Sequence, residues 1–412
     1  MGTLKVLLLL VVQAVLAITL FVDVTTAGKT CEVASKGNSG DDTDAILSAF
    51  KSCGQNGRIV FGNQVYYVKR VMNTTGLRNV QIELRGKILA RINHCLFADT
   101  TYWLEQSQPI GYQNMSTVWW LGGDNITFDG FGTGTIDGNG QVWYDLVKGY
   151  SNYPRRPMGL TIVNTTNSIF RGLRFVQSQM WTMTILRSQN VLLTDIFVNS
   201  TSRSRSPARN TDGADTLFVN NITFRGWKVI NGDDGISLKA NSSNVLIEDC
   251  DFYGLGFALG SIGQYKGIFE HIENVTVRGI RYFGTQWPAY IKTWTGVAKG
   301  YPPNGGGGGF GFSNVTVTRA YGAFQIGQCT HFRDGGQDGD CDTSRFQIRD
   351  IRVSDIKGTI TKDSVASLKC SASAPCSGLS FSNISLKRES GASIQKYSCA
   401  NVVDPKGFNC GL

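Results

Sequence analysis

One short phrase recurs along this chain of 412 residues and limits the folds that it can adopt. The phrase starts with Asn, continues with alternating, mostly β-branched residues, and in most copies ends with Gly or Asp. From the Asn167 copy onward, successive Asn residues lie 23, 31, 23, 30 and 40 positions apart, so the smallest repeating unit is close to 23 residues. Clear copies begin at Asn125, Asn167, Asn190, Asn221, Asn244, Asn274 and Asn314. Alternation with period two predicts strands, and short strands at a regular interval predict a solenoid.

The interval also distinguishes between repeat architectures. No helical pattern lies between the copies, so each coil is expected to contain only strands and turns, as in a parallel β-helix. A β-propeller is the alternative, but its blades repeat at roughly 40–50 residues. The Asn residues are expected to stack as an internal ladder at a turn, and the repeat runs to about Ser385. We therefore predict one all-β domain over residues 28–412.

Both ends of the predicted solenoid have their own covers. The acidic run at residues 41–44 is typical of a helix N-terminus, and it predicts a short cap helix over residues 45–53 with Ile46 and Phe50 on one face. The disulfide-rich tail, residues 386–412, is expected to cover the other end. Solenoids need such covers because their terminal coils would otherwise expose apolar surface.

The first 27 residues resemble a secretory signal peptide. Lys5 precedes an apolar run from Val6 to Val22, and small residues follow up to Ala27, after which cleavage is expected. A transmembrane anchor is the alternative, but the run is short and no basic cluster follows it. No other apolar stretch is long enough to span a bilayer. We therefore predict a secreted, extracellular protein without a membrane partner.

The chain has ten cysteines, and an even number behind a signal peptide indicates disulfides. Spacing suggests four bonds between near neighbours and leaves Cys95 and Cys250 over. The expected pairs are Cys31–Cys53, Cys329–Cys341, Cys370–Cys376 and Cys399–Cys410. The spacings fit no zinc pattern and the chain has only three His, so no metal and no other cofactor is predicted.

The net charge of +9 suggests an acidic partner. No Lys/Arg-rich run and no nucleic-acid motif is present, so we expect an acidic polysaccharide rather than nucleic acid. The alternative is that the charge serves solubility only. Sequons for N-glycosylation are frequent, and several fall on the Asn of the repeat, where a structural role is the alternative. We expect a monomeric glycoprotein.

Three carboxylates stand at related places in neighbouring repeats. Asp212 lies in an Asn-Thr-Asp-Gly run that begins at Asn210, and Asp233 and Asp234 follow 21 and 22 residues later in Gly-Asp-Asp. If each repeat is one coil, these residues lie on adjacent strands, which are about 4.8 Å apart. One carboxyl group could then protonate a leaving oxygen while another activates water. Crowding of like charges would raise the pKa of one of them.

Two later segments are expected at nearly the same phase of the coil. Leu255 lies in Gly-Leu-Gly about one coil after Asp234, and Tyr290 and Lys292 follow one longer coil later. With the acids they would form a polar stripe along one face. A single Asp at a turn is more often structural, and we interpret Asp215 as a turn-stabilising residue.

Residues near Asp212 are candidates for sugar binding. Asn210 and Arg209 lead directly into the Asp212 turn, and Trp181 could stack on a sugar face, although a buried aromatic residue is the alternative. Other arginines, at positions 155, 156, 203 and 205, are interpreted as groove candidates that are individually more typical of solvated surface charge. The insertion 284–311 is placed where a loop could close one end of a groove, which would make an enzyme exo-acting.

These segments resemble glycoside hydrolase family 28, the polygalacturonase family. Its signatures are Asn-Thr-Asp, Gly-Asp-Asp, Gly-His-Gly and Arg-Ile-Lys. The resemblance extends to the run Gly-Thr-Ile-Asp-Gly-Asn-Gly at residues 134–140 with Trp143, and to Ser-Gln-Met-Trp at residues 178–181, so it covers nearly all of the mature chain. It implies a right-handed parallel β-helix with a groove for pectin, and hydrolysis with inversion.

By this resemblance Asp233 is the general acid, Asp212 and Asp234 activate the water, and Lys292 contacts the substrate. The chain departs from the signatures at two positions, where Leu255 replaces the family His and Tyr290 replaces the family Arg. Neither replacement can form an ion pair with a uronate carboxylate. The chemistry is therefore expected to be kept while recognition of the sugar is changed.

The strings around Leu255 and Tyr290 are most similar to those of fungal exo-acting members of the family. The predicted function is hydrolysis of pectin by an exo-acting enzyme of the galacturan 1,4-alpha-galacturonidase (exo-polygalacturonase) type. The alternative is a rhamnogalacturonan hydrolase or an α-L-rhamnosidase of the same family. A pectate lyase and a non-catalytic pectin-binding β-helix are the lesser alternatives.

Overall fold

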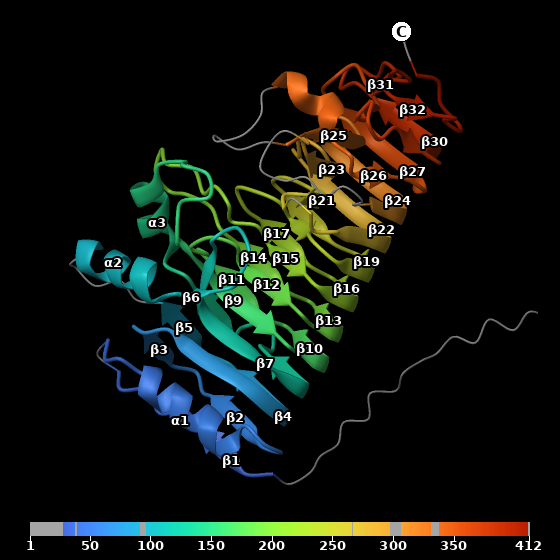
Figure 1. The fold of residues 1–412 in the computed structure, drawn as a ribbon. Coiled ribbons are helices and arrows are strands. Elements are labelled where there is room, and N and C mark those ends of the chain that lie inside the picture. The colour runs from blue at the N-terminus through green and yellow to red at the C-terminus, as the bar shows by residue number, and fades with distance from the viewer. Residues whose placement is uncertain are drawn as a thin grey trace, which may run out of the picture.

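The computed structural model describes residues 28–37, 39–90, 96–265, 267–296, 306–330 and 338–410. In these ranges short strands stack along one axis in successive coils (Figure 1). Strands pair in parallel with the strands one coil before and one coil after, for example β10 with β7 and β13. The predicted right-handed parallel β-helix is therefore confirmed. The predicted signal peptide and Cys95 lie outside the described residues.

Each coil has three faces. The first, called the ladder face, contains β2 (Arg58–Phe61), β4 (Met72–Leu84), β7 (Ser116–Asp129), β10 (Thr166–Arg171), β13 (Gln189–Thr194), β16 (Val219–Arg225), β19 (Ser242–Glu248), β22 (His271–Phe283), β24 (Gly306–Ala320), β27 (Ile351–Ile360) and β30 (Ser380–Lys387). The second face contains β3 (Val65–Val68), β5 (Lys87–Ala90), β8 (Thr135–Asp137), β11 (Arg174–Val176), β14 (Phe197–Asn199), β17 (Lys228–Ile230) and β20 (Asp251–Tyr253).

The third face carries the candidate site. It contains β9 (Pro157–Val163), β12 (Met183–Leu186), β15 (Ala214–Leu217), β18 (Ile236–Leu238), β21 (Phe257–Ile262), β23 (Ala289–Trp294), β25 (Phe324–Thr330), β28 (Ala366–Lys369) and β31 (Tyr397–Ala400). Short strands complete the pairing: β1 (Thr30–Glu32) with β2, β6 (Gln108–Pro109) antiparallel to β7, β26 (Gln347–Ile348) with β24, and β29 (Cys376–Ser377) with β32 (Val402–Val403).

The interior is filled by apolar side chains that stack in register from coil to coil. On the ladder face one such row runs through Val191, Ile222, Val245, Val275 and Phe310, all of them buried. Alternate residues of a strand point to opposite sides of the sheet, so the period-two pattern separates this core from the polar exterior. Burial contributes about 25 cal/mol for each Å² of apolar surface removed from water.

The repeated Asn residues form a ladder, but it lies on the exterior rather than inside the coil as expected. Asn190 donates from Nδ2 to Oδ1 of Asn167 at 3.1 Å, and Asn221 donates to Oδ1 of Asn190 at 2.9 Å. All three have left-handed backbone conformations, with φ of 49°, 54° and 55° for Asn167, Asn190 and Asn221, which Asn tolerates well. These side chains are exposed because the aliphatic rows fill the interior and leave the amides to the turn surface.

The cap helix is confirmed as α1 (Thr43–Cys53), with Ile46 and Phe50 buried against the first coil. Its N-terminus is held in a different way from a simple side-chain cap. Asp41 accepts from the Thr43 N–H at 3.0 Å, while the buried Asp42 accepts from the Lys36 and Tyr67 N–H groups at 2.7 and 2.8 Å. The acidic run therefore joins the helix to neighbouring chain segments.

The expectation that no helix lies between repeat copies is wrong. Helix α3 (Gly140–Val147) lies between the Asn125 and Asn167 copies, and α2 (Leu96–Gln106) precedes β6. In α3 the side chains of Trp143 and Tyr144 are buried. The helix has only eight residues, too few to show helical periodicity against the strand pattern. Both helices lie on the same side of the stack, in its N-terminal half (Figure 1).

The four predicted disulfides are all present, and Cys250 is a free, buried thiol. Cys31–Cys53 ties α1 to β1, and Cys341 lies in the short 3₁₀ helix η1 (Asp338–Thr343). The remaining two bonds lie in the last coils and the tail. Among the described helices, none has the length and apolar character needed to cross a membrane.

Candidate active site

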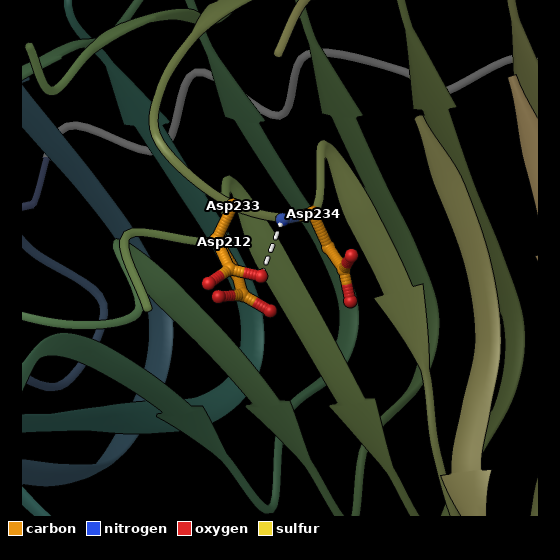
Figure 2. Close-up of side chains that lie close together, drawn as sticks. All are labelled: Asp212, Asp233 and Asp234. Atoms are coloured by element: carbon orange, nitrogen blue, oxygen red, sulfur yellow. Dashed lines mark hydrogen bonds between the residues drawn. The ribbon is translucent and has the colours of Figure 1, made fainter. Parts of the chain in front are cut away.

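The three predicted carboxylates meet at the start of two adjacent strands of the third face. Asp212 precedes β15, and Asp233 and Asp234 precede β18. The register Ala214↔Ile236 places Asp212 opposite Asp234. One oxygen from each carboxylate lies within 4.8 Å of the others. Figure 2 shows the side chains of Asp212 and Asp233 close together, with Asp234 beside them.

Backbone amides orient the general-acid candidate. The Asn210 N–H donates to Oδ2 of Asp233 at 2.8 Å, and the Asp234 N–H donates to its Oδ1 at 3.1 Å, the bond dashed in Figure 2. Asn210 has a left-handed conformation with φ of 57°, and this directs its N–H towards the next coil. Asp233 therefore has a fixed rotamer while staying only half-buried, whereas Asp212 and Asp234 are buried.

The glycines of the two motifs allow the turns to stack this closely. A Cβ on Gly213 would lie 2.3 Å from the Gly235 carbonyl oxygen, and one on Gly235 would lie 2.4 Å from the Phe252 ring. A side chain at position 213 would push the two turns apart, and one at position 235 would displace the turn from the Phe252 ring. The spacing of the acids therefore depends on Gly following the Asp in both motifs.

Lys292 supplies a positive charge to this cluster. Its Nζ donates to Oδ2 of Asp234 at 2.8 Å, although Lys292 lies on β23, two strands beyond β18. Between them lies β21, whose outward-facing residues in register with Tyr290 and Lys292 are Ala258 and Gly260. These small residues leave room for the lysine side chain to cross. Burial alone would lower the pKa of Lys292, but the charges of Asp234 and Asp233 raise it overall.

The acids hold protons more strongly than free carboxyl groups do. Burial raises the pKa of Asp212 well above its usual value, and the neighbouring carboxylates Asp215 and Asp233 add to the shift. Burial and then Asp234 raise the pKa of Asp233. Asp234 differs from both in being paired directly with the Lys292 ammonium, so the three carboxyl groups have different surroundings. A general acid and a base can therefore coexist at one pH.

Leu255, Tyr290 and Lys292 were expected at equivalent positions of successive coils, level with the acids, and this is only partly so. Leu255 is level with Asp234 because Phe257 pairs with Ile236, and its N–H donates to the Asp233 carbonyl at 3.2 Å. Tyr290 instead pairs with Ala258, three positions further along the strand. It reaches the site only at its tip, where the hydroxyl is 3.5 Å from the Lys292 Nζ. The extra residues before β23 move Tyr290 out of register with Leu255, and the spacing of these residues in the sequence did not show this.

Asp215 is not a turn residue, contrary to expectation. It lies within β15, buried, with Oδ1 at 3.2 Å from the Nζ of Lys239. Burial raises the pKa of Asp215 to about 7 while Lys239 opposes the shift. The lysine Nζ also lies 4.8 Å over the ring of Trp181. Trp181 is therefore a buried aromatic residue beneath a lysine, not an exposed platform for a sugar.

Lys239 was missed by the sequence reasoning. Leu238 pairs with Leu259, so Lys239 follows in the same outward row as Gly260 and Lys292. Once the register is known, two lysines on one row beside three acids form a recognisable signal. The interval of the repeat alone was too irregular to align them.

Arg209 is exposed and contributes its backbone rather than its charge. The Arg209 carbonyl accepts from Nη1 of Arg156 at 2.9 Å. Arg156 was interpreted as a surface charge but is completely buried. Asn210 also has a structural role, because its Oδ1 accepts from the Asn152 N–H at 2.8 Å. The loop before β9 therefore supports the turn that carries Asp212.

A segment between α2 and β7, residues 107–115, crosses the outer surface of the third face, and we call it the strap. Its residues Ile110 and Tyr112 pack on outward apolar residues that include Leu186 and Leu217. At the far end of the crossing the Gln113 N–H donates to the hydroxyl oxygen of Tyr265 at 2.8 Å, and Gln113 Nε2 donates to Oε1 of Gln264 at 2.6 Å. The strap thus ties an early coil to the loop that follows β21.

A hollow of about 210 Å³ lies between the strap and the loop before β9. Its lining includes the polar residues Gln113, Asn114 and Asn152 and also the cations Arg155 and Arg156, whose guanidinium groups bond to the carbonyls of Glu105 and Arg209. Asn152 is also the residue whose N–H donates to Asn210, so the hollow adjoins the Asp212 turn.

The insertion 284–311 was expected to form a loop that closes one end of a groove. Its residues 297–305 lie outside the described residues, and its residues 306–311 belong to β24.

Comparison with known proteins places this geometry in a family. The sequence profile of glycosyl hydrolases family 28 matches residues 69–410. Alpha-L-rhamnosidase rgxB of Aspergillus niger is 47% identical over 390 residues, which cover 92% of this chain and 89% of that protein. Exopolygalacturonase of Cochliobolus carbonum is 33% identical over 397 residues, covering 91% and 84%.

A solved structure agrees in overall shape. That of endo-xylogalacturonan hydrolase from Aspergillus tubingensis matches with a TM-score of 0.80 and 28% identity, covering 93% of this chain and 98% of the other. The profile spans most of the chain, and both relatives cover more than four fifths of it. The protein therefore belongs to glycosyl hydrolases family 28 and is a pectin-degrading glycoside hydrolase.

Proposed function

We propose that this protein is a secreted, exo-acting α-L-rhamnosidase that removes terminal rhamnose from rhamnogalacturonan. The observation that carries the proposal is the replacement of the two cationic family positions by Leu255 and Tyr290 beside the three acids. Rhamnose is a 6-deoxy sugar with a methyl group where galacturonate has a carboxylate. A Leu side chain and a Tyr ring suit a methyl group, and neither can pair with a carboxylate. The 47% identity to an α-L-rhamnosidase supports the same choice.

An exo-acting galacturonidase, the function favoured from the sequence, becomes the second candidate. The exopolygalacturonase relative supports it, as do the two lysines near the acids. However, Lys292 is already paired with Asp234 and Lys239 with Asp215. A uronate carboxylate would have to compete with those carboxylates for each ammonium. The two lesser alternatives were a pectate lyase and a non-catalytic binding protein. Membership of a glycosyl hydrolase family favours hydrolysis over both.

In the proposed reaction Asp233 protonates the glycosidic oxygen. As the bond from that oxygen to the anomeric carbon breaks, water adds to the same carbon and loses its proton to Asp212 or Asp234. The half-buried position of Asp233 supports contact with the leaving group. Lys292 donates to Asp234 and holds its carboxylate in place beside the water.

The hollow beside the Asp212 turn supports exo action. The strap and the loop before β9 bound it on the side of the earlier coils, while the third face continues through β21 and β23 on the other side. A terminal sugar would occupy the hollow, and the remaining chain would extend over the later coils. The side-chain amides of Gln113, Asn114 and Asn152 suit the hydroxyl groups of a sugar, while the guanidinium groups of Arg155 and Arg156 in the same lining are bonded to backbone carbonyls.

The deciding experiment is parallel product analysis on rhamnogalacturonan oligosaccharides with rhamnose at the non-reducing end and on polygalacturonate. Free rhamnose from the first substrate is the expected result. Free galacturonate from the second would select the second candidate, and mixed oligosaccharides would contradict exo action. Asp233→Asn should abolish release, while Asp195→Asn, an exposed Asp on the ladder face, is the matched control.

Secretion is supported by the apolar leader and by four disulfides, since such bonds persist in oxidising compartments. Expression with the leader intact should yield an extracellular protein. N-terminal sequencing is expected to start at Gly28. Retention of the protein in the cell with its leader uncut would contradict secretion.

A further inference from the structure

Arg156 is a fully buried cation behind the acid cluster. Its Nε donates to the Gln179 carbonyl and its Nη1 donates to the Arg209 carbonyl at 2.9 Å, while Nη2 has no partner among the described residues. Among the described residues, the Arg156 guanidinium donates to backbone carbonyls and forms no ion pair with a carboxylate. The Tyr144 ring lies 5.9 Å from the guanidinium carbon, but burying an arginine without a paired carboxylate still costs free energy.

The hydrogen bonds of Arg156 lead to the general-acid candidate through a single peptide group. The Arg209 carbonyl and the Asn210 N–H belong to the same amide. Its oxygen accepts from the Arg156 guanidinium, and its N–H donates to Oδ2 of Asp233 at 2.8 Å. A cation bonded to the oxygen of an amide polarises that amide and strengthens its N–H as a donor. Arg156 and Asp233 are therefore coupled without direct contact.

We propose that Arg156 is a positioning residue that tunes the acidity of Asp233 through the peptide between Arg209 and Asn210. Arg156 does not touch the substrate in this proposal. The inference rests on the role proposed above for Asp233 as the general acid.

The peptide between Arg209 and Asn210 is held by hydrogen bonds at two points, so its N–H stays directed at Asp233. Arg156 holds its carbonyl, and the Asn152 N–H holds the Asn210 side chain at 2.8 Å. Both Asn152 and Arg156 belong to the loop before β9. The peptide therefore cannot rotate away from Asp233 without breaking bonds to this loop.

Several charged groups face Asp233 and share in setting its proton affinity. Burial and then the Asp234 carboxylate raise it, the Lys292 ammonium and the two backbone N–H bonds lower it, and Asp212 lies beside it. The more distant Lys239 lies 3.2 Å from Asp215. Burial lowers the pKa of Arg156 to about 10, a shift that Tyr144, Asp233 and Asp212 oppose, so the guanidinium stays charged wherever the carboxyl groups titrate.

The test is the dependence of kcat/KM on pH for Arg156→Gln, Arg156→Lys and the unaltered enzyme. Loss of the cation should raise the pKa of Asp233, so the alkaline limb of the Gln variant should move upward by roughly 0.5–1 pH unit. The Lys variant keeps a charge and should retain most of the original profile. Arg352→Gln, which changes an exposed arginine on the ladder face, should leave the profile unchanged.

A structural role predicts a different result. Activity would then fall by the same factor at every pH, with both limbs in place, and the proposal would be overturned. If the Gln variant does not fold, Arg156→Met decides, because it removes the charge without adding an unpaired buried amide, and its alkaline limb should move upward by the same amount. An unmoved limb in the Met variant would in that case contradict the proposal.

The Asp233→Asn variant separates failure of this inference from failure of the proposed mechanism. If Asp233→Asn retained hydrolysis, the role of Asp233 itself would be wrong. If it were inactive and the Arg156→Gln limb did not move, only the coupling through Arg156 would be wrong.

Discussion

The Nζ atom of Lys292 lies 2.8 Å from Oδ2 of Asp234, although 58 residues separate the two in the sequence. The contact spans two strands of the third face, and it exists because Ala258 and Gly260 leave the intervening strand without bulky outward side chains. The charge state of the acid cluster thus depends on three coils at once. A single coil cannot carry this site.

Removal of the lysine charge tests this relationship. Lys292→Met should lower kcat by about 10²–10³-fold, the usual cost of removing one electrostatic contact from an active site. The cause is loss of the ammonium group that pairs with Asp234 at 2.8 Å. Steady-state kinetics measure the effect. Lys369→Met is the matched control, because Lys369 lies in the same outward row, beyond Gly327. Equal losses in both variants would contradict a specific role for Lys292.

Restoration of the family residues should change the preferred sugar. The double variant Leu255→His, Tyr290→Arg is expected to gain release of galacturonate from polygalacturonate and to lose release of rhamnose. The ratio of the two kcat/KM values should change by about tenfold or more, since a charged partner would be created for a uronate and the apolar contact removed. Product analysis by chromatography measures both. No change in the ratio would mean that these positions do not select the sugar.

The dependence of stability on pH follows from the buried Asp215. Its pKa is raised by burial from 3.8 to about 7, so the folded state binds its proton more tightly than the unfolded state. This contribution favours folding at low pH and is lost as pH rises from about 4 to about 7. The thermal midpoint of the enzyme should therefore fall between pH 5 and pH 7 by ~2 °C or more.

Asp215→Asn removes this titration and should make the fall of the thermal midpoint in that interval smaller, while the raised pKa values of Asp212 and Asp233 still contribute to it. Differential scanning calorimetry at several pH values compares the variant with the unaltered enzyme. Asp195→Asn, on an exposed turn, should keep the original slope. If the slope of Asp215→Asn were also unchanged, other groups would govern stability in this range.

Inversion at the anomeric carbon is a prediction from the family resemblance. The closest oxygens of the three acids lie within 4.8 Å of one another, less than the roughly 6.5–9.5 Å that separates the carboxyl groups of most inverting glycosidases. Proton NMR of the first product formed should show the anomer opposite to that of the substrate. Formation of the same anomer first would favour a covalent intermediate on one of the acids.

The fold could be predicted because its signals are local. An Asn followed by alternating residues marks the turn and the strand of each coil, and the repeat interval was sufficient to bring Asp212 and Asp233 together. Near-neighbour spacing was likewise enough to pair eight cysteines correctly. Each of these inferences depends on residues that are close in sequence or one regular coil apart.

The remainder of the site depends on register and on long insertions. Tyr290 lies three positions beyond the level of Leu255 because extra residues precede its strand, and the sequence does not show how such residues fold. Arg156 and Lys239 are buried cations, and the sequence contains no local mark of a charge that tertiary packing will cover. Asp215 was misjudged for the same reason, since a carboxylate in a strand and one in a turn have the same neighbours in sequence.

The external ladder of Asn side chains also determines where this scaffold tolerates change. The interval from Asn190 to Asn221 exceeds that from Asn167 to Asn190 by eight residues (31 against 23), and all eight lie between β14 and β15, next to the acids. The amide rungs keep a constant pitch while the loops over the third face vary in length. Loop grafting could therefore exchange the sugar-facing segments of related enzymes without disturbing the frame that sets the distance between coils.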